Sequence, residues 1–386
     1  MRVVVTVLAV WCAGLGAAAQ FGKISVLFGG LGDQYAGASA VALGLIVSIV
    51  GIVGLVFGTT AGLFVAQIGP RRAIVAALVM GAGMSAVQSL GLSYGGMIAS
   101  RVVEGVSHLA IVVVGPTVIA GLAAERYRGL AMTLWSSFFG VTYAVLALVA
   151  PVLLVAYGAA GVFVAHGAWM AGMAVCLWLL LPQDPPAPQI ARVGILAQHL
   201  AIYASPRLSA PALGFFCYTF LYVALLTLVP PDVPVAQRAV VAAGMPLISI
   251  VLSLTLGVWL LGRMSAVRVV QGGYLAAVPG FGVLALFWGQ GAGMVAGALW
   301  VSAALGIVQG ASFAAIPELN AAAQDRAQAA GAIAQLGNLG TTTGTPVLAA
   351  LLLGAGPWGL AMVAFLACVL GIFLHAVQAA RRARGI

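Results

Sequence analysis

The chain has 386 residues and a net charge of +9; 63% of the residues are hydrophobic and 6% are charged, whereas about one quarter of a soluble domain is charged. This composition excludes a soluble fold, and the long unbroken apolar runs exclude a β-barrel, whose strands alternate apolar and polar residues. The basic residues stand singly or in pairs between apolar runs, so they indicate membrane topology and exclude nucleic acid as a partner. The composition therefore predicts an all-α membrane protein with many spanning helices, embedded in a lipid bilayer.

The N-terminal stretch MRVVVTVLAVWCAGLGAAAQFGK fits two interpretations. One arginine, an apolar run and the small residues Ala17-Ala18-Ala19 have the form of a secretory signal peptide with its cleavage site. The apolar run continues, however, past Lys23, the only lysine of the chain, through FGKISVLFGGLG. Since this is longer than the core of a signal peptide, we predict a first spanning helix near 4–30 that carries Lys23 into the bilayer.

Apolar runs long enough to cross a bilayer as helices, about 20 residues each, recur along the whole chain. The stretch 182–207, with its prolines and charges, separates six such runs from six more. The sequence thus predicts one six-helix domain over 1–181, a cytoplasmic linker over 182–207 and a second six-helix domain over 208–386. The predicted spans are 4–30, 37–66, 72–92, 95–122, 129–153, 158–181, 208–230, 237–262, 267–288, 293–317, 327–353 and 357–380.

The arginines orient these spans. If both termini lie in the cytoplasm, the outside loops keep only Arg238, and thirteen arginines fall inside, as the positive-inside rule requires. An Ala-rich and Gly-rich chain with arginine in place of nearly all lysine suits a bacterium, so we expect the inner membrane. The inside set is Arg2, Arg71, Arg72, Arg126, Arg128, Arg192, Arg207, Arg263, Arg268, Arg326, Arg381, Arg382 and Arg384.

The cysteines do not indicate a site. Each lies in a different apolar run, with no CxxC spacing and no neighbouring histidine, so we expect core thiols with neither a disulfide nor a metal ion. No phosphate-binding loop GxxxxGK[ST] is present, and we expect no cofactor. The four cysteines are Cys12, Cys176, Cys217 and Cys368.

Two short motifs carry a family resemblance. The first is GLFVAQIGPRR, between the second and third spans. It resembles the loop motif of the major facilitator superfamily, in which an Asp-Arg pair usually stands where this chain has Ala66 and Gln67. The second is RVVEG in the fourth span, beginning at Arg101, which resembles the Arg-x-x-x-Gly signature associated with proton coupling in many members. The Gly-Pro antiporter motif is replaced in the fifth span by Ala150-Pro151. The loop positions that match are Gly62, Gly69, Arg71 and Arg72.

The resemblance implies a fold of 12 transmembrane helices in two six-helix bundles with pseudo-twofold symmetry, and a substrate cavity between them that opens by alternating access. In the family the loop aspartate takes part in a gating network, so this chain must gate with other contacts. Glu125-Arg126 after the fourth span is echoed by Asp325-Arg326 after the tenth. These pairs either belong to the gate or simply cap helices and fix topology.

Four ionisable residues are expected at membrane depth, where charge is costly and therefore usually functional: Lys23, Arg101, Glu104 and His108. Lys23 and Arg101 are predicted to share a layer about 10 Å below the outer face, from the rise of a helix. Arg101, Glu104 and His108 are spaced three and then four residues apart, so they share one helical face. His166 and His375 are expected to lie alone with structural roles.

The simplest arrangement has Glu104 between the two cations Lys23 and Arg101, which leaves one net positive charge. In one interpretation, Glu104 only neutralises Lys23 or Arg101 and holds two helices together. In a second, the surplus cation attracts an anionic substrate group, while Glu104 or His108 carries a proton. In a third, the charges serve only conformational switching. The second half of the chain offers neutral candidates, which suggests a substrate with an anionic end and an uncharged body. These further substrate-binding candidates are Tyr218, Tyr222, Gln309, Gln335 and Asn338.

The sequence therefore predicts a secondary transporter for a small organic anion or zwitterion, coupled to protons and active as a monomer. No Ser-His-Asp arrangement or paired carboxylate accompanies the four residues, so we do not expect an enzyme. A multidrug exporter that works as a proton antiporter is the first alternative, and a membrane receptor or scaffold without transport is the second.

Overall fold

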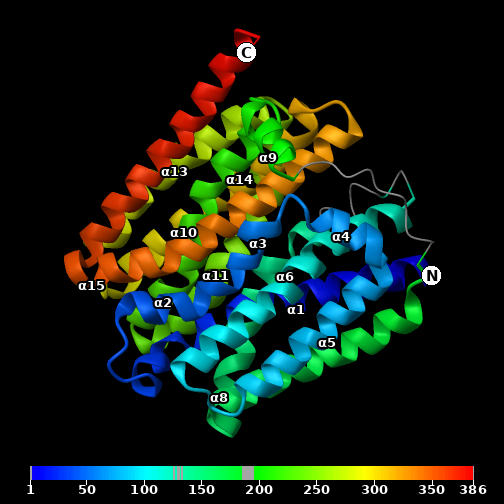
Figure 1. The fold of residues 1–386 in the computed structure, drawn as a ribbon. Coiled ribbons are helices and arrows are strands. Elements are labelled where there is room, and N and C mark those ends of the chain that lie inside the picture. Colours follow the sequence, from blue (N-terminus) through cyan, green and yellow to red (C-terminus); the bar gives the residue numbers. More distant parts are fainter. Residues whose placement is uncertain (1, 125–126, 128–130, 132–133, 185–194, 386) are drawn as a thin grey trace. The chain divides into compact units, whose positions relative to one another are not determined.

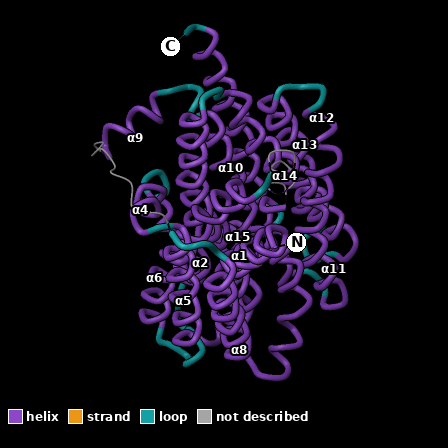
Figure 2. The backbone as a smooth tube through the Cα atoms, turned by 90° about the vertical axis from the view of Figure 1, so that its right-hand side faces the viewer, coloured by secondary structure: helices purple, strands orange, loops and turns teal. Residues whose placement is uncertain are grey.

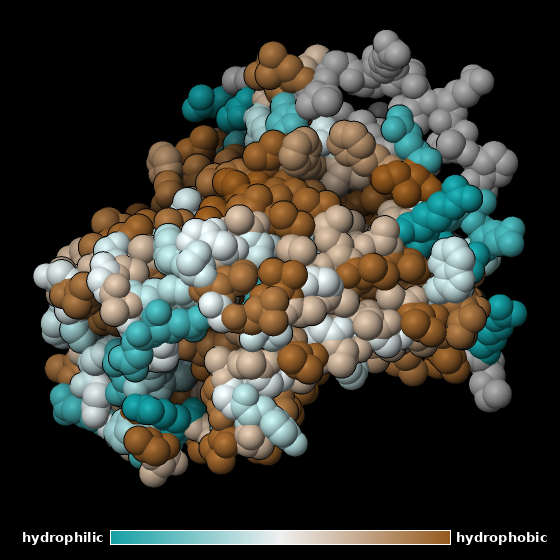
Figure 3. Space-filling view, turned by 60° about the horizontal axis from the view of Figure 1, so that its bottom comes forward, coloured by the Kyte–Doolittle hydropathy of each residue, from teal (hydrophilic) through white to brown (hydrophobic). Residues whose placement is uncertain are grey.

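The structure is a computed structural model that describes residues 2–124, 127, 131, 134–184 and 195–385. These residues form helices joined by turns, without a strand among them (Figure 2), which confirms the prediction of an all-α fold. Apolar side chains cover broad areas of the face shown in Figure 3, as expected for a surface that meets lipid. Nine helical segments of the described chain are long and apolar enough to cross a membrane.

The chain divides into two compact units. Unit 1 comprises Met1–Gly37 and Ile49–Ala191, and unit 2 comprises Ala38–Ser48 and Arg192–Ile386. The helices of unit 1 are α1 (Arg2–Gln34), the 3-10 turn η1 (Ile49–Gly51), α3 (Ile52–Phe57), α4 (Ala61–Ile68), α5 (Pro70–Gln88), α6 (Tyr94–Leu122) and α8 (Phe138–Leu180). Unit 2 contains α2 (Ala40–Ser48), α9 (Ile195–Ala204), α10 (Ala210–Asp232), α11 (Val235–Leu252), the π-turn η2 (Ser253–Gly257), α12 (Val258–Leu261), α13 (Ala266–Leu286), α14 (Gly291–Leu319) and α15 (Ala323–Ala383).

Two pairs of predicted spans are joined into single long helices. α8 covers both 129–153 and 158–181 in part, and α15 covers 327–353 and 357–380; each bends at one glycine with positive φ, Gly158 (65°) and Gly356 (67°). A side chain is strained in that backbone conformation, so glycine permits the sharp bend without a loop. If each half is counted as a span and the 19-residue α5 is added, the nine segments become twelve, although that count stays a prediction.

Two other predicted spans are irregular helices. The segment 37–66 divides into α2, η1, α3 and α4, of which Ala40–Phe57 forms one candidate span and α4 lies beyond it. The predicted span 237–262 matches the candidate span Val235–Leu261, which contains the π-turn η2. Glycine is a poor residue for a helix interior because it gains the most backbone entropy on unfolding, and Gly51, Gly54 and Gly58 all lie within the first segment.

Helices α1, α5, α6 and α8 pack against one another in unit 1 (Figure 1). Small residues let them approach closely: a Cβ added at Gly81 of α5 would lie 2.8 Å from the Ser107 Oγ of α6 and 3.0 Å from the Gln20 Nε2 of α1. Consequently, polar side chains from all four helices can reach one another in the interior of unit 1.

In unit 2, α10 is the most buried candidate span, with 83% of its most apolar stretch inside the protein. Gly340 and Gly344 of α15 lie against the backbone of Phe216 and Phe220 of α10, where a Cβ would have no room. The first half of α15 therefore packs closely against α10.

Candidate functional site

Lys23 of α1 lies fully buried in the interior of unit 1. Its Nζ is 2.5 Å from Glu104 Oε1 and donates to Ser85 Oγ at 2.6 Å. The same nitrogen lies 3.3 Å from His166 Nδ1 and 5.4 Å from the centre of the Phe163 ring. The ammonium is therefore surrounded by one carboxylate, two neutral acceptors and an aromatic face, each of which favours a positive charge.

Glu104 of α6 accepts hydrogen bonds on both oxygens. Lys23 binds Oε1, while Arg101 Nη1 and Gln88 Nε2 (3.1 Å) bind Oε2. Gln88 also donates to Ser100 Oγ at 3.1 Å. Lys23, Arg101 and Glu104, all with no exposed surface, thus form a buried charged trio with one net positive charge. Lys23 and Arg101 contact the same carboxylate, which fits the expectation that these two share a layer; the depth of that layer and the role of the three residues stay predictions.

His166 of α8 does not lie alone, so that expectation was wrong. Its Nε2 is 2.9 Å from the carbonyl oxygen of Gly16, and its Nδ1 is 2.6 Å from Ser85 Oγ. A carbonyl only accepts, so Nε2 carries the hydrogen, and Nδ1 of the neutral ring accepts from the Ser85 hydroxyl. His166 is thereby joined to Lys23 through Ser85.

His108 has a different setting one turn along α6 from Glu104. Its Nδ1 is 3.0 Å from the carbonyl oxygen of Ala17, and its ring meets Phe21 edge to face with centroids 5.1 Å apart. Nδ1 therefore carries the hydrogen, the opposite tautomer to that of His166. The contacts described for His108 are with α1 and include no hydrogen bond to Glu104.

Sequence reasoning missed Ser85, Gln88 and His166. Ser85 and Gln88 of α5 are three residues apart and thus on one face of a predicted span, a signal that was available. The choice of partner, however, depends on how each helix is rotated in the bundle, which spacing within one helix does not specify.

The neutral candidates of unit 2 have different contacts. Tyr218 and Tyr222 of α10 stack with centroids 5.0 Å apart, and Phe215 stacks on Tyr218 at 5.1 Å. Asn338 of α15 donates to the carbonyl oxygen of Ala334 at 2.7 Å. Gln309 of α14 is half-buried.

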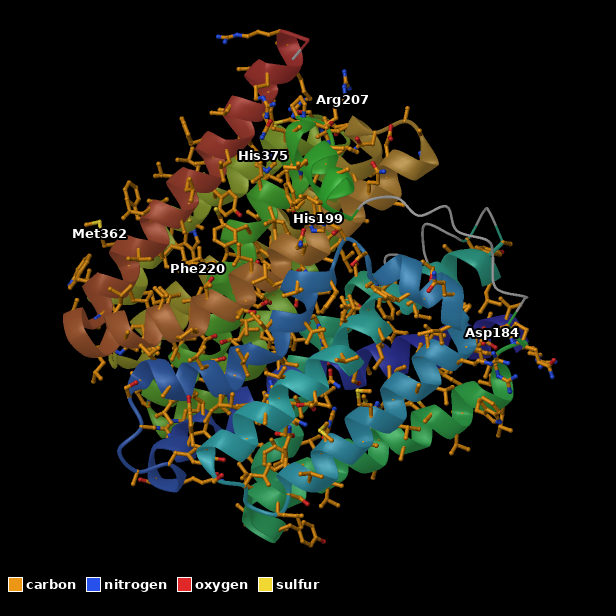
Figure 4. The ribbon with its side chains drawn as sticks, in the orientation of Figure 1. Asp184, His199, Arg207, Phe220, Met362 and His375 are labelled. Atoms are coloured by element: carbon orange, nitrogen blue, oxygen red, sulfur yellow. The ribbon has the colours of Figure 1, made fainter. Side chains whose placement is uncertain are left out.

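Gln335 binds α9 with both ends of its amide. Burial raises the pKa of Tyr203 to about 12, so its hydroxyl keeps its proton and donates to Gln335 Oε1 at 2.6 Å. Gln335 Nε2 then faces His199 Nε2 at 2.9 Å (Figure 4) and donates to it. Gln335 thus ties the segment between the two predicted bundles to α15.

The loop between α4 and α5 is held by Asp184, which follows α8 (Figure 4). Gly69 has φ of 95° and offers no side chain to cap α5, and Asp184 instead accepts from the backbone N–H groups of Arg71 (2.7 Å) and Arg72 (3.0 Å). In return, the Arg71 guanidinium lies 4.1 Å from the centre of the Trp178 ring and donates to the Trp178 carbonyl at 2.5 Å. The start of α5 is thus capped by Asp184, four residues beyond α8, and the end of α8 is capped by Arg71 of α5.

The other predicted gating residues have few described contacts that bear on a gate. Glu125 and Arg126 lie outside the described residues. Asp325 stands in the first turn of α15, where its charge suits the helix dipole, and Arg326 donates to the carbonyl oxygen of Ala321 at 3.1 Å. Gly62 of α4 is exposed.

Comparison with known proteins identifies the fold. A family model described as Major Facilitator Superfamily matches residues 6–345. The inner membrane transport protein YajR of Escherichia coli (strain K12) is 25% identical over 200 residues, which are 50% of this chain and 42% of that protein.

Solved transporters share the whole architecture. The human organic anion transporter MFSD10 (TETRAN) aligns with a TM-score of 0.74 at 19% identity, over 97% of this chain and 99% of that chain. A bacterial homologue of the human lysosomal transporter Spinster, inward-facing and occupied, aligns with a TM-score of 0.76 at 15% identity, over 98% and 96%. Fold and family are those of multi-pass membrane transporters, and the chain belongs to the major facilitator superfamily.

Proposed function

We propose that the protein is a secondary active transporter of a bacterial inner membrane that moves a small organic anion or zwitterion, coupled to protons. The observation that carries this proposal is the buried charged trio with its net positive charge. A buried cation without full compensation is costly, and such groups within a membrane domain are usually kept for function.

The trio suggests how an anion and a proton would be coupled. Lys23 and Arg101 are both engaged by Glu104, so an anion must compete with this carboxylate for them. A proton on Glu104 would remove the competitor and leave two cations for the substrate. By linkage, the anion then favours the protonated form of Glu104 as much as the proton favours anion binding.

The remaining predicted residues have supporting roles in this proposal. His108 is the second proton-coupling candidate, and the neutral side chains of unit 2 would meet the uncharged body of the substrate. The loop of Gly62, Gly69, Arg71 and Arg72 would act in a cytoplasmic gate, with both termini on that side of the membrane. Asp184 supports this role because it supplies a carboxylate to a loop in which Ala66 replaces the usual aspartate.

A binding screen followed by flux measurements tests the proposal. Purified protein is heated with succinate, glutamate, glycerol 3-phosphate or tetraphenylphosphonium, since a bound ligand raises the unfolding temperature. We expect an anion to stabilise the protein and to enter proteoliposomes faster under an imposed pH gradient. Lys23→Gln and Arg101→Gln should each abolish that uptake.

Three outcomes would contradict the proposal. Stabilisation by tetraphenylphosphonium that survives Lys23→Gln and fails in Glu104→Gln would indicate a multidrug exporter. Binding without flux under any gradient would indicate a receptor. Anion flux that is the same with and without the gradient would exclude proton coupling.

A further inference from the structure

We infer that Lys23 and His166 share one proton through Ser85, so that His166 is the group that accepts the proton when Lys23 gives up its charge. This deepens the proposed proton coupling and rests on it. His166 lies in α8, outside both motifs that resemble the family. It is also outside the residues that the sequence predicted for proton coupling, Glu104 and His108.

The three side chains form a closed triangle of polar atoms. Lys23 Nζ is 2.6 Å from Ser85 Oγ, Ser85 Oγ is 2.6 Å from His166 Nδ1, and Lys23 Nζ is 3.3 Å from the same Nδ1. All three residues are buried. Both short distances suit hydrogen bonds, so a proton would have a direct path from the lysine to the histidine.

The direction of each hydrogen bond follows from its end groups. The ammonium of Lys23 can only donate, and the carbonyl of Gly16 at the far side of His166 can only accept. Ser85 therefore accepts from Lys23 and donates to Nδ1. The Nδ1 lone pair is the one basic position of His166, and a neutral, reversible hydroxyl occupies it.

Simultaneous charge on both groups is unfavourable. Two cations 3.3 Å apart in a buried site repel strongly, and Ser85 cannot separate them. The charged groups around His166 are Lys23 of α1 and, beyond it, Arg101 and Glu104 of α6; α5 contributes the neutral Ser85. Since the one carboxylate is engaged by Lys23 and Arg101, none is left to stabilise a second cation.

The transfer is balanced. One N–H bond of Lys23 breaks as its proton moves to Ser85 Oγ, and the original hydroxyl proton of Ser85 moves to Nδ1 of His166. Lys23 becomes a neutral amine, His166 becomes an imidazolium and the total charge is unchanged. An anion held by Lys23 would thereby lose its cationic partner, which links proton position to substrate release.

His108 and Glu104 are less suitable acceptors for this step. His108 carries its hydrogen on Nδ1 toward Ala17, and its described contacts do not include Lys23. Glu104 already accepts on both oxygens from two cations and an amide. The Nδ1 atom of His166 is bonded to a neutral group alone, apart from its contact with Lys23.

Nitrogen NMR on the full chain in nanodiscs tests the inference without any substrate. Lys23 is the only lysine, so ¹⁵N-lysine gives one side-chain signal, and ¹⁵N-histidine gives four rings that single His→Asn variants assign. Between about pH 5 and about pH 9, we expect the charged forms of Lys23 and His166 never to be the majority together. At neutral pH, His166 should carry its hydrogen on Nε2 and His108 on Nδ1.

Two variants sharpen the test. In Lys23→Met the repelling charge is absent, so the fraction of imidazolium at His166 should rise several-fold at the acid end, while the His108 signal stays unchanged. Ser85→Ala should shift the Nδ1 signal of His166, whereas the matched Ser107→Ala, which removes a buried hydroxyl bonded to Gln20, should not.

Majority charge on both Lys23 and His166 at one pH would overturn the inference, as would equal protonation of His166 in wild type and Lys23→Met. Anion flux that is equal with and without a pH gradient would instead refute the proposed proton-coupled transport. It would not change the NMR result, which is obtained without substrate.

Discussion

Unit 1 and unit 2 hold polar groups in an apolar interior in different ways. Unit 1 buries the charged trio, whereas the buried polar residues described in unit 2 are hydroxyls, tyrosines, amides and one histidine. The ion pairs of the described chain all belong to unit 1. Among the residues that the structure describes, the fully buried charged side chains therefore all lie in unit 1. The proposed function needs this difference: unit 1 would respond to charge, and unit 2 would supply a neutral surface.

The two units also differ in how they begin α5 and α13, each of which corresponds to the third predicted span of its half. α5 of unit 1 starts after Gly69 and has only Asp184 to accept its first N–H groups. α13 of unit 2 has its own cap, Ser265, which accepts from Arg268 N, and a second acceptor in Glu318, which binds Ala266 N at 2.7 Å. The start of α5 therefore depends on one residue, and the start of α13 on two.

The largest effect is expected at Glu104. Glu104→Gln leaves two buried cations without a carboxylate and should lower the free energy of unfolding by about 3–5 kcal/mol. Titration of purified protein with SDS, followed by tryptophan fluorescence, measures the change. Lys23→Met leaves the neutral pair of Arg101 and Glu104 and should cost less. A larger loss for Lys23→Met than for Glu104→Gln would contradict this account of the trio.

A smaller effect is expected at Asp184. Asp184→Ala removes the one cap of α5 found among the described residues and should cost about 1–2 kcal/mol of unfolding free energy, as the loss of an N-cap does. The pair of Asp184 with the exposed Arg72, 4.0 Å apart, adds little to this. Glu318→Ala is the matched control, measured by the same titration, and should cost less because Ser265 remains. Equal losses would contradict the contrast between the two helix starts.

The sequence predicted the charged trio because the rise and period of a helix are fixed. Depth placed Lys23 and Arg101 in one layer, and the three-residue spacing put Glu104 on the face of Arg101. Ser85 and His166 were not predicted, because their contacts depend on the rotation of α5 and α8 against α1. That rotation is set by small residues such as Gly81, whose role is visible only in three dimensions.

The fold, like the site, was predicted only in part. Apolar runs predicted the helices, but they did not show that α8 and α15 continue through Gly158 and Gly356, where loops were expected. Asp184 was included in the predicted linker, so its part in capping α5 was missed. A carboxylate that acts on a helix more than one hundred residues away in sequence has no local signal.

The smallest effect concerns the link between α9 and α15. Burial raises the pKa of Tyr203 from 10.0 to about 12, so the folded protein holds this proton more tightly than the unfolded chain. The resulting stability is present below about pH 10 and is lost as the pH rises toward about 12. Tyr203→Phe should cost about 0.5–1.5 kcal/mol at neutral pH through the lost bond to Gln335, and should lose less stability on the alkaline side.

Unfolding midpoints of wild type and Tyr203→Phe across this pH range give the measurement. Tyr157→Phe is the control, since that side chain is 71% exposed and should leave the neutral-pH midpoint unchanged. An equal alkaline loss in wild type and Tyr203→Phe would show that the Tyr203 proton does not contribute. A steeper loss in the wild type would place part of the stability of unit 2 in α9, outside its candidate spanning helices, whereas the charged trio of unit 1 lies on the candidate spanning helices α1 and α6.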